Sequence, residues 1–408
     1  MIVGVSVKNY KVIRSLRSLS LGRFHVLVGP NASGKSTFLD AIDFVRDCLA
    51  KGPLGAVEDR VPDLRDLTFM RRGGNIEIEL WLDLGSQLEG QKDSLLQYRL
   101  VLRAHEAMGV CVDRESLQQY SKSWLPAGKP LEFSAKVKPK RLLGKTSKGS
   151  DFFQREVGTY QDSFVFGLDK LTLGATPPDE KRFPTANAVR RFLMQGIRYL
   201  QLNSRAMREP CAATRPTDLE LDGTNLARVV GRLRGKHSGS QRNGGTLPHS
   251  EALDAWTEHL RFALEDLDEI GWGRREPDNA EYLILKYANS LECPSWLLSD
   301  GTLRMLALTL PAFLPANPAI YMVEEPENGV HPRALEVILR ALTSITAGQV
   351  LVATHSPLVV QAVGREPLLC FSRTENGARI VRGNAHPLLK EWDGTPDLAT
   401  VFASGVLA

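Results

Sequence analysis

The segment 29–36 limits the fold more than any other part of the sequence. It has the sequence Gly-Pro-Asn-Ala-Ser-Gly-Lys-Ser, which fits the pattern Gly-x4-Gly-Lys-Ser/Thr. An apolar stretch at 24–28 precedes it, and a stretch with apolar residues at helical spacing begins at Ser36. A strand, a glycine-rich loop and a helix in this order predict the phosphate-binding loop (P-loop, residues 29–36) of an α/β nucleotide-binding domain.

The residue types of this loop suit a bound polyphosphate. Glycines let the backbone wrap around a phosphate, so that successive N–H groups and the start of the helix point at it. Lys35 can then reach the β- and γ-phosphate oxygens, and the Ser36 hydroxyl can bind Mg2+. The predicted nucleotide-binding residues here are Gly29, Pro30, Asn31, Ala32, Ser33, Gly34, Lys35, Ser36 and Thr37.

A second motif lies at 319–326, where the apolar run Ala-Ile-Tyr-Met-Val ends in Glu-Glu-Pro. Such a run predicts a buried parallel strand that brings carboxylates to the edge of the sheet where ligands bind. We expect Glu324 to hold Mg2+ through water and Glu325 to polarise the attacking water. Lys35 completes this part of the predicted catalytic set, because phosphoryl transfer depends mainly on positioning and charge stabilisation.

Two further motifs make a resemblance specific. Residues 298–302 are Leu-Ser-Asp-Gly-Thr before a helical stretch, and 353–357 are Ala-Thr-His-Ser-Pro after an apolar one. Together with the P-loop and the acidic strand, this order resembles the ABC-type ATPases of the SMC/RecF class. More narrowly, it is similar to the short AAA-labelled ATPases of DNA repair and bacterial anti-phage systems. The segment 221–227 fits the same group, and the likeness is clearest at the two ends of the chain.

The resemblance implies roles for particular residues. Ser299 and Gly301 would donate to the γ-phosphate of ATP held by the opposite subunit, and His355 would contact the γ-phosphate and the attacking water. Each chain would then hold half a site, and ATP would join two chains in a homodimer or a higher oligomer. The bound groups would be ATP and Mg2+.

Some assignments within the resemblance stay open. Glu327 and Asn328 are candidates for the loop that crosses the dimer seam, or they are ordinary turn residues. Gln201 or Asn203 is a candidate for the glutamine of the family's glutamine loop. The chain departs from the broad ABC pattern with Ser-Asp-Gly-Thr in place of Ser-Gly-Gly-Gln and with Glu324 in place of an aspartate. The first departure weakens a transporter hypothesis.

The predicted fold class is α/β: an ABC/SMC-type head with an antiparallel β subdomain and a mixed, mostly helical insertion. We expect an N-terminal lobe at 1–84, the rest of the β subdomain and the insertion at 85–290, and a C-terminal lobe at 291–408. The alternating stretch 76–84 predicts a half-buried strand paired with 97–103. Helices are predicted at 185–200 and 251–268.

Charge and composition narrow the partners only slightly. The net charge is +4, and the basic stretches 136–148 and 228–242 are predicted to be exposed loops. They either contact a nucleic-acid backbone or are simply solvated. Five scattered cysteines, an N-terminus without the features of a secretion signal, and no apolar run of about 20 residues favour a cytoplasmic protein without a membrane span.

The leading functional hypothesis is an ATPase whose cycle gates a DNA-repair or anti-phage partner. We expect that partner to be a separate effector, such as a nuclease or a toxin, because no nuclease centre is evident in this chain. One alternative is an ATP-sensing scaffold that sequesters such an effector with little turnover. A transporter ATPase subunit is a third and less favoured alternative.

Overall fold

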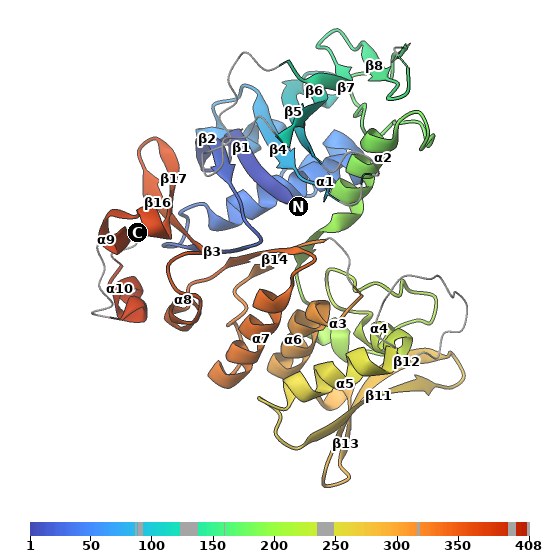
Figure 1. The fold of residues 1–408 in the computed structure, drawn as a ribbon, viewed down its shortest axis with the longest axis vertical. Helices are drawn as coiled ribbons and strands as arrows, with labels where there is room; N and C mark the ends of the chain where they lie inside the picture. The colour runs from blue at the N-terminus through green and yellow to red at the C-terminus, as the bar shows by residue number, and fades with distance from the viewer. Residues whose placement is uncertain are drawn as a thin grey trace.

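The structure is a computed structural model. It describes residues 1–85, 88, 93–122, 138–158, 160–234, 249–315, 319–390 and 397–405. Three sheets and the helices around them form two lobes on either side of a central sheet (Figure 1). In the described residues, no helix is both long enough and apolar enough to cross a membrane.

The central sheet has six strands in the order β10-β14-β15-β3-β16-β17. All neighbouring pairs are parallel except β16 and β17. The strands are β3 (Phe24–Val28), β10 (Ile197–Leu200), β14 (Ile320–Glu324), β15 (Gln349–Ala353), β16 (Leu368–Thr374) and β17 (Gly377–Arg382).

The parallel strands of this sheet are buried on both faces. Leu27 and Leu351 belong to one apolar core, and Val26 and Val352 belong to the other. Successive side chains of a strand point to opposite faces, so each strand contributes to both cores. This explains why the strands appear in the sequence as continuous apolar runs rather than as alternating ones.

The core on one face is shared with helix α1 (Lys35–Glu58) and with a second sheet. α1 lies between the two sheets (Figure 1), and it breaks at Gly52, which precedes Pro53 and has non-helical backbone angles. The second sheet is antiparallel. Its strands, in spatial order, are β2 (Ile13–Ser20), β1 (Ile2–Tyr10), β4 (Ile76–Leu82), β5 (Ser94–His105), β6 (Gly109–Ser121), β7 (Lys140–Lys145), β8 (Asp151–Gln154) and β9 (Gln161–Phe164).

The core on the other face is covered by helices and by a small third sheet. Helices α6 and α7 pack side by side below β14, and α4, α5 and β11 lie farther out (Figure 1). The elements of this lobe are α3 (Ser204–Arg208), α4 (Leu226–Leu233), α5 (His249–Leu260), β11 (Leu267–Arg275), β12 (Ala280–Tyr287), β13 (Glu292–Pro294), α6 (Asp300–Thr309) and α7 (Pro332–Ser344). The remaining helices are α2 (Pro184–Arg191), α8 (Pro357–Val363), α9 (Pro387–Lys390) and α10 (Leu398–Ala403).

The structure confirms the predicted α/β class and the pairing of 76–84 with 97–103 as β4 and β5. Two helix predictions are partly wrong. The helix predicted at 185–200 ends in a π-helical turn at Phe192–Gly196, and its last four residues form strand β10 of the central sheet. The helix predicted at 251–268 ends at Leu260, because β11 begins at Leu267.

The prediction of exposed basic loops is only partly right for the described residues: Lys138, Arg141 and Lys148 are exposed, but much of both stretches has regular structure. Within 136–148, the residues from Lys140 to Lys145 form β7, and Lys145 is buried with its ammonium 2.9 Å from an Asp151 carboxylate oxygen. Within 228–242, helix α4 carries Arg228 and Arg232, which are engaged in ion pairs described below. Residues 136–137 and 235–242 lie outside the described residues.

Candidate nucleotide-binding site

The predicted site residues gather where three neighbouring parallel strands end. Strand β15 pairs with β3 on one side and with β14 on the other. The P-loop follows β3, Glu324 is the last residue of β14, and Thr354 and His355 follow β15. Because the carboxyl ends of parallel strands meet at one edge of the sheet, these segments lie close together.

The shape of the P-loop depends on its glycines. Gly29 has a φ of 143°, and a Cβ there would overlap the carbonyl oxygen of Phe371 on the neighbouring strand β16. Gly34 has a φ of 110° and is the residue before α1, without any side-chain cap. Only glycine adopts such angles without strain, and the uncapped start of α1 leaves backbone N–H groups available to an anion.

Two polar side chains of the loop are buried without the partners they would have around a phosphate. The hydroxyl of Ser33 is buried and has no hydrogen-bond partner among the described residues. The ammonium of Lys35 donates to the loop's own carbonyl oxygens, at 2.8 Å from Gly29 and 3.0 Å from Pro30. Buried polar atoms without partners are uncommon in native proteins, so an anion in this cradle accounts for both observations.

Burial lowers the pKa of Lys35 to about 8, although Glu324, Glu325 and Glu327 oppose the shift through their charges. Desolvation penalises the charged ammonium, and the nearby carboxylates only partly compensate. A polyphosphate in the loop would supply the missing negative charge. An anion bound beside Lys35 would therefore stabilise the charged form of its ammonium group.

Glu324 has the surroundings expected of a ligand to a hydrated cation. One of its carboxylate oxygens is buried and has no partner within the described part of the chain. Burial raises the pKa of the neighbouring Tyr199 hydroxyl, and the charge of Glu324 raises it further. Ser36 is exposed at the start of α1. One carboxylate and one hydroxyl fit Mg2+, which usually binds few protein ligands together with phosphates and waters.

The described residues contain no group of three or more His, Cys, Asp or Glu side chains arranged for a metal.

Glu325 differs from Glu324 in its backbone and its exposure. It has a φ of 46°, and its side chain is exposed. Its N–H donates to Ala353 at 2.8 Å, and Arg304 of α6 donates to its carbonyl oxygen at 3.3 Å. Left-handed backbone at a non-glycine residue is unfavourable and persists where neighbouring contacts hold it. These two contacts hold the turn at Glu325.

Glu327 connects this turn to the segment after β15. One of its carboxylate oxygens accepts from the Thr354 hydroxyl at 2.7 Å and from the His355 backbone N–H at 2.9 Å. Its other oxygen is buried without a partner in the described chain. Glu327 thus lies against its own subunit, whereas Asn328 is exposed.

The signature segment, residues 298–302, lies apart from the P-loop. Ser299 caps α6, since its hydroxyl accepts from the Thr302 N–H at 3.1 Å. A Cβ on Gly301 would lie 2.7 Å from the carbonyl oxygen of Gly329, so glycine is needed for this close approach. Across the described residues, no hydrogen bond or ion pair joins Ser299 or Gly301 to residues 29–36.

The two candidates for the glutamine loop differ in their environment. Asn203 caps α3 by accepting from the Ala206 N–H at 3.1 Å, so its side chain already has a structural role. Gln201 is exposed and directly follows β10, whose Leu200 pairs with Val323 of β14. The next position on β14 is Glu324. The register therefore favours Gln201 over Asn203.

A pocket beside the P-loop was not predicted from the sequence. It has a volume of about 640 Å³, within the usual range for small-molecule sites. Its lining comes from four separate segments: Lys11 and Val12; Ala32 and Ser33; Phe69 and Met70; and Arg373, Thr374, Glu375, Gly377 and Ala378. Only the segment at 32–33 carries a sequence signal, because the others meet it through the tertiary fold.

A family profile described as "AAA domain, putative AbiEii toxin, Type IV TA system" matches residues 24–82 and 207–361. These two segments make up more than half of the chain and contain the P-loop, the signature segment and the acidic strand.

The chain belongs to this AAA family. No curated protein sequence matches the AAA chain significantly.

Solved structures show the fold. The chain is similar to an SmcHead bound to the C-terminal winged-helix domain of ScpA, with a TM-score of 0.51 and 13% identity over 93% of this chain and 97% of that one. This likeness shows an SMC-head fold, as predicted. An SMC head from Thermotoga maritima matches with a TM-score of 0.41 and 13% identity over 93% and 98% of the two chains. A Pyrococcus furiosus Smc head bound to the C-terminal domain of ScpA matches with a TM-score of 0.48 and 12% identity, over 93% of this chain and 95% of that one.

Proposed function

We propose that this AAA protein binds and hydrolyses ATP with Mg2+ in a composite site that two copies of the chain complete. The observation that carries the proposal is the set of unsatisfied polar atoms at one edge of the sheet. Ser33 and Glu324 each have a buried oxygen without a partner among the described residues, and the ammonium of Lys35 donates to carbonyl oxygens of its own loop. The family and the fold support the same interpretation, since both are associated with nucleotide use.

In this proposal the P-loop residues hold the phosphates. Lys35 leaves the carbonyl oxygens of Gly29 and Pro30 and donates to the phosphate oxygens, while Ser33 and the N–H groups at the start of α1 donate as well. Ser36 and Glu324 hold Mg2+, which would neutralise the charge that develops on the transferred phosphoryl group. The pocket formed by 11–12, 69–70 and 373–378 takes the nucleoside.

Glu325 and His355 act on the attacking water. The exposed Glu325 carboxylate accepts a proton from it, and His355 orients it beside the terminal phosphate. Glu327 holds the backbone of His355 through its accepted hydrogen bond. Glu324, which has one buried carboxylate oxygen, thus faces the cation, and the exposed Glu325 faces the water.

The second chain supplies the signature segment. Ser299 can keep accepting from Thr302 and donate its own O–H to a phosphate, because a hydroxyl is both donor and acceptor. In the described residues of one chain, no hydrogen bond or ion pair joins Ser299 or Gly301 to the P-loop, which supports delivery of the signature segment from another chain. ATP binding would then close two heads, and hydrolysis would release them.

We further propose that this cycle gates a separate effector protein in DNA repair or anti-phage defence. The family description names a toxin of a type IV toxin–antitoxin system, and the matching SmcHead was solved with a bound partner domain. Direct DNA contact through 228–234 is not favoured, because Arg228, Arg232 and Arg234 pair with Glu281, Asp218 and Glu269. A scaffold that senses ATP with little turnover is the alternative, and the measured turnover separates the two.

The test is the Glu325→Gln variant. We expect ATP affinity to stay within about threefold and single-turnover hydrolysis to fall by about 1000-fold, because a general base contributes roughly 100- to 10,000-fold. Light scattering with ATP should show that the variant accumulates as a dimer. Glu336→Gln, which alters an exposed glutamate on α7 paired with Arg340, is the matched control and should behave as wild type. Undiminished hydrolysis by Glu325→Gln would refute the assignment.

A further inference from the structure

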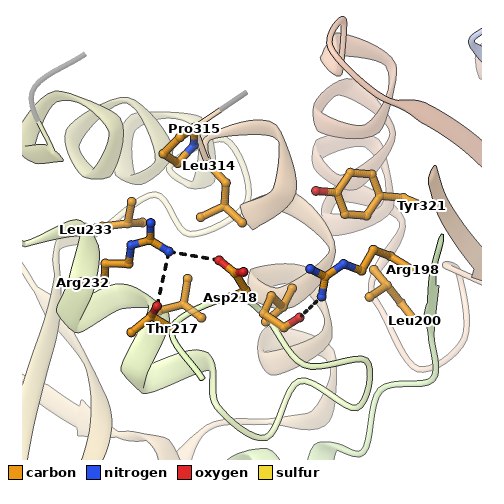
Figure 2. A pocket seen from close by; sticks show the side chains of 11 residues that line it. Arg198, Leu200, Thr217, Asp218, Arg232, Leu233, Leu314, Pro315 and Tyr321 are labelled. Atoms are coloured by element: carbon orange, nitrogen blue, oxygen red, sulfur yellow. Dashed lines mark hydrogen bonds and ion pairs between the residues drawn. The ribbon is translucent and has the colours of Figure 1, made fainter. Parts of the chain in front are cut away.

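A second cavity lies on the far side of the central sheet from α1, beside the edge strand β10. It has a volume of about 190 Å³ and lies between β10, β14, the loop at 217–219 and helix α4. Figure 2 shows the side chains that line it. None of these residues is part of the candidate nucleotide site.

Most of the cavity wall is apolar. Leu200 is 6% exposed and Leu233 is 2% exposed; Leu314 lies on the side of Leu233, and Leu200 lies on the side of Arg198 (Figure 2). A dry engineered cavity of about 150 Å³ binds benzene. The wall and the volume therefore suit a single ring or a short branched chain with one small polar substituent.

The polar part of the wall is formed by two register partners. Arg198 of β10 pairs with Tyr321 of β14 in the parallel ladder, so their side chains lie next to each other on one face of the sheet. Both point toward the centre of the cavity (Figure 2). One Arg198 nitrogen donates to the Leu219 carbonyl oxygen at 3.1 Å, and its remaining donors and the Tyr321 hydroxyl have no partner among the described residues.

An ion pair at the rim leaves the interior positive. Arg232 lies 3.0 Å from Asp218, and their side chains are 42% and 64% exposed, whereas Tyr321 is only 8% exposed. The lining carries the guanidinium groups of Arg198 and Arg232 and the carboxylate of Asp218, so its summed charge is positive. Burial raises the pKa of Tyr321, which keeps its hydroxyl protonated as a second donor.

We infer that this cavity binds a small organic carboxylate, with the apolar body against Leu200, Leu233 and Leu314 and the carboxylate between Arg198 and Tyr321. A planar carboxylate matches a guanidinium fork and an adjacent hydroxyl, and a neutral ligand would leave the Arg198 donors unpaired. The two polar residues belong to two strands, so a bound anion holds β10 and β14 together.

The two strands that hold Arg198 and Tyr321 also lead to residues of the candidate nucleotide site. Tyr321 lies three residues before Glu324 on β14, and Arg198 lies three residues before Gln201 after β10. A ligand that fixes these strands changes how Glu324 and Gln201 are presented. The inference concerns binding of a metabolite-sized acid, which can be measured without any ATPase assay.

The experiment is calorimetric titration of the full chain with benzoate and with benzyl alcohol as the neutral probe of similar size. We expect saturable benzoate binding in the millimolar range, about tenfold tighter than benzyl alcohol, because a hydrogen bond to a charged group is worth about one order of magnitude in affinity. Tyr321→Phe and Arg198→Gln should each weaken benzoate binding by about tenfold. Tyr287→Phe, which removes a hydroxyl from β12, is the matched control and should leave it unchanged.

The proposal is overturned if benzoate binds no more tightly than benzyl alcohol, if Tyr321→Phe binds benzoate as wild type does, or if no saturation occurs up to about 20 mM. Thermal melting of each variant shows whether it is folded. Tyr321→Phe keeps the buried ring and so tests the inference even if Arg198→Gln does not fold.

Discussion

The P-loop and the signature segment both lie at the start of a helix, but their polar groups are used in opposite ways. Helix α1 begins after Gly34 without a side-chain cap, and Ser33 beside it has a buried hydroxyl with no partner in the described chain. Helix α6 begins after Ser299, whose hydroxyl already caps it. The first helix start requires a ligand to satisfy its groups, whereas the second is stable alone and can serve as a preformed donor.

The P-loop and the signature segment also differ in the residues that surround them. Within one chain, the P-loop is close to the residues proposed to hold Mg2+ and to orient water, because β3, β14 and β15 are neighbours. The signature segment contacts helix α3 and the turn after β14: Arg208 pairs with Asp300 at 2.7 Å, and Gly329 lies against Gly301. This contrast is the physical basis for proposing that nucleotide held by one chain meets the signature of another.

The largest expected effect removes the charge from the P-loop. Lys35→Ala should weaken ATP binding by about 100-fold, or about 2.7 kcal/mol, since charge-assisted hydrogen bonds to phosphate are lost. Equilibrium binding of a fluorescent ATP analogue measures this. Lys51→Ala changes an exposed lysine of the same helix that pairs with Asp59, and it should have no effect. A change of less than threefold in Lys35→Ala would mean that phosphate binds elsewhere.

A smaller effect comes from titrating the same lysine. Burial lowers its pKa to about 8. The free protein therefore loses the Lys35 charge as the pH rises through about 8, whereas ATP binds the charged form. ATP affinity should be constant below this pH and fall by up to about tenfold per pH unit above it.

Proton uptake measures this linkage directly. Calorimetry at pH 8.5 in buffers with different heats of ionisation should show that ATP binding takes up a proton. Lys35→Arg stays charged throughout and should remove the pH dependence. Equal affinity at pH 7 and pH 9.5, with no proton uptake, would contradict the role given to Lys35.

The smallest effect concerns the cap of α6. Ser299→Ala should lower the free energy of unfolding by about 1 kcal/mol, whereas Ser299→Asp should be near neutral because aspartate also caps helices well. Urea denaturation compares the two variants with wild type. If Ser299→Ala were as stable as wild type, the Ser299 cap would not stabilise the start of α6, and the proposed contrast with the uncapped α1 would be wrong.

The sequence predicts those parts whose signal is local. The P-loop needs glycine at particular backbone angles, and the strands before it and before Glu325 are apolar because both faces of the sheet are buried. The sequence predicts helix rather than strand at β10, because a segment as short as Ile197–Leu200 has no clear period of its own. Only its pairing with β14 shows that it is a strand.

Other features could not be predicted because they depend on residues far apart in the chain. Lys145 has the charge of a surface residue, but Asp151 on the adjacent strand neutralises it in the core. The pocket beside the P-loop joins residues 11–12, 69–70 and 373–378, which have no common pattern. Glu327 was a candidate for the dimer seam, and only the fold shows that its carboxylate accepts from Thr354 and His355.

Mixing two inactive variants tests the central claim most directly. Lys35→Ala cannot hold ATP, and Ser299→Asp keeps the cap of α6 but places a negative charge against the phosphate from the partner. Each variant alone should be inactive. A 1:1 mixture should recover about one quarter of wild-type turnover, because about half of the dimers are mixed and each mixed dimer has one intact composite site. A mixture as inactive as its components, or a Ser299→Asp variant that is fully active alone, would contradict the account.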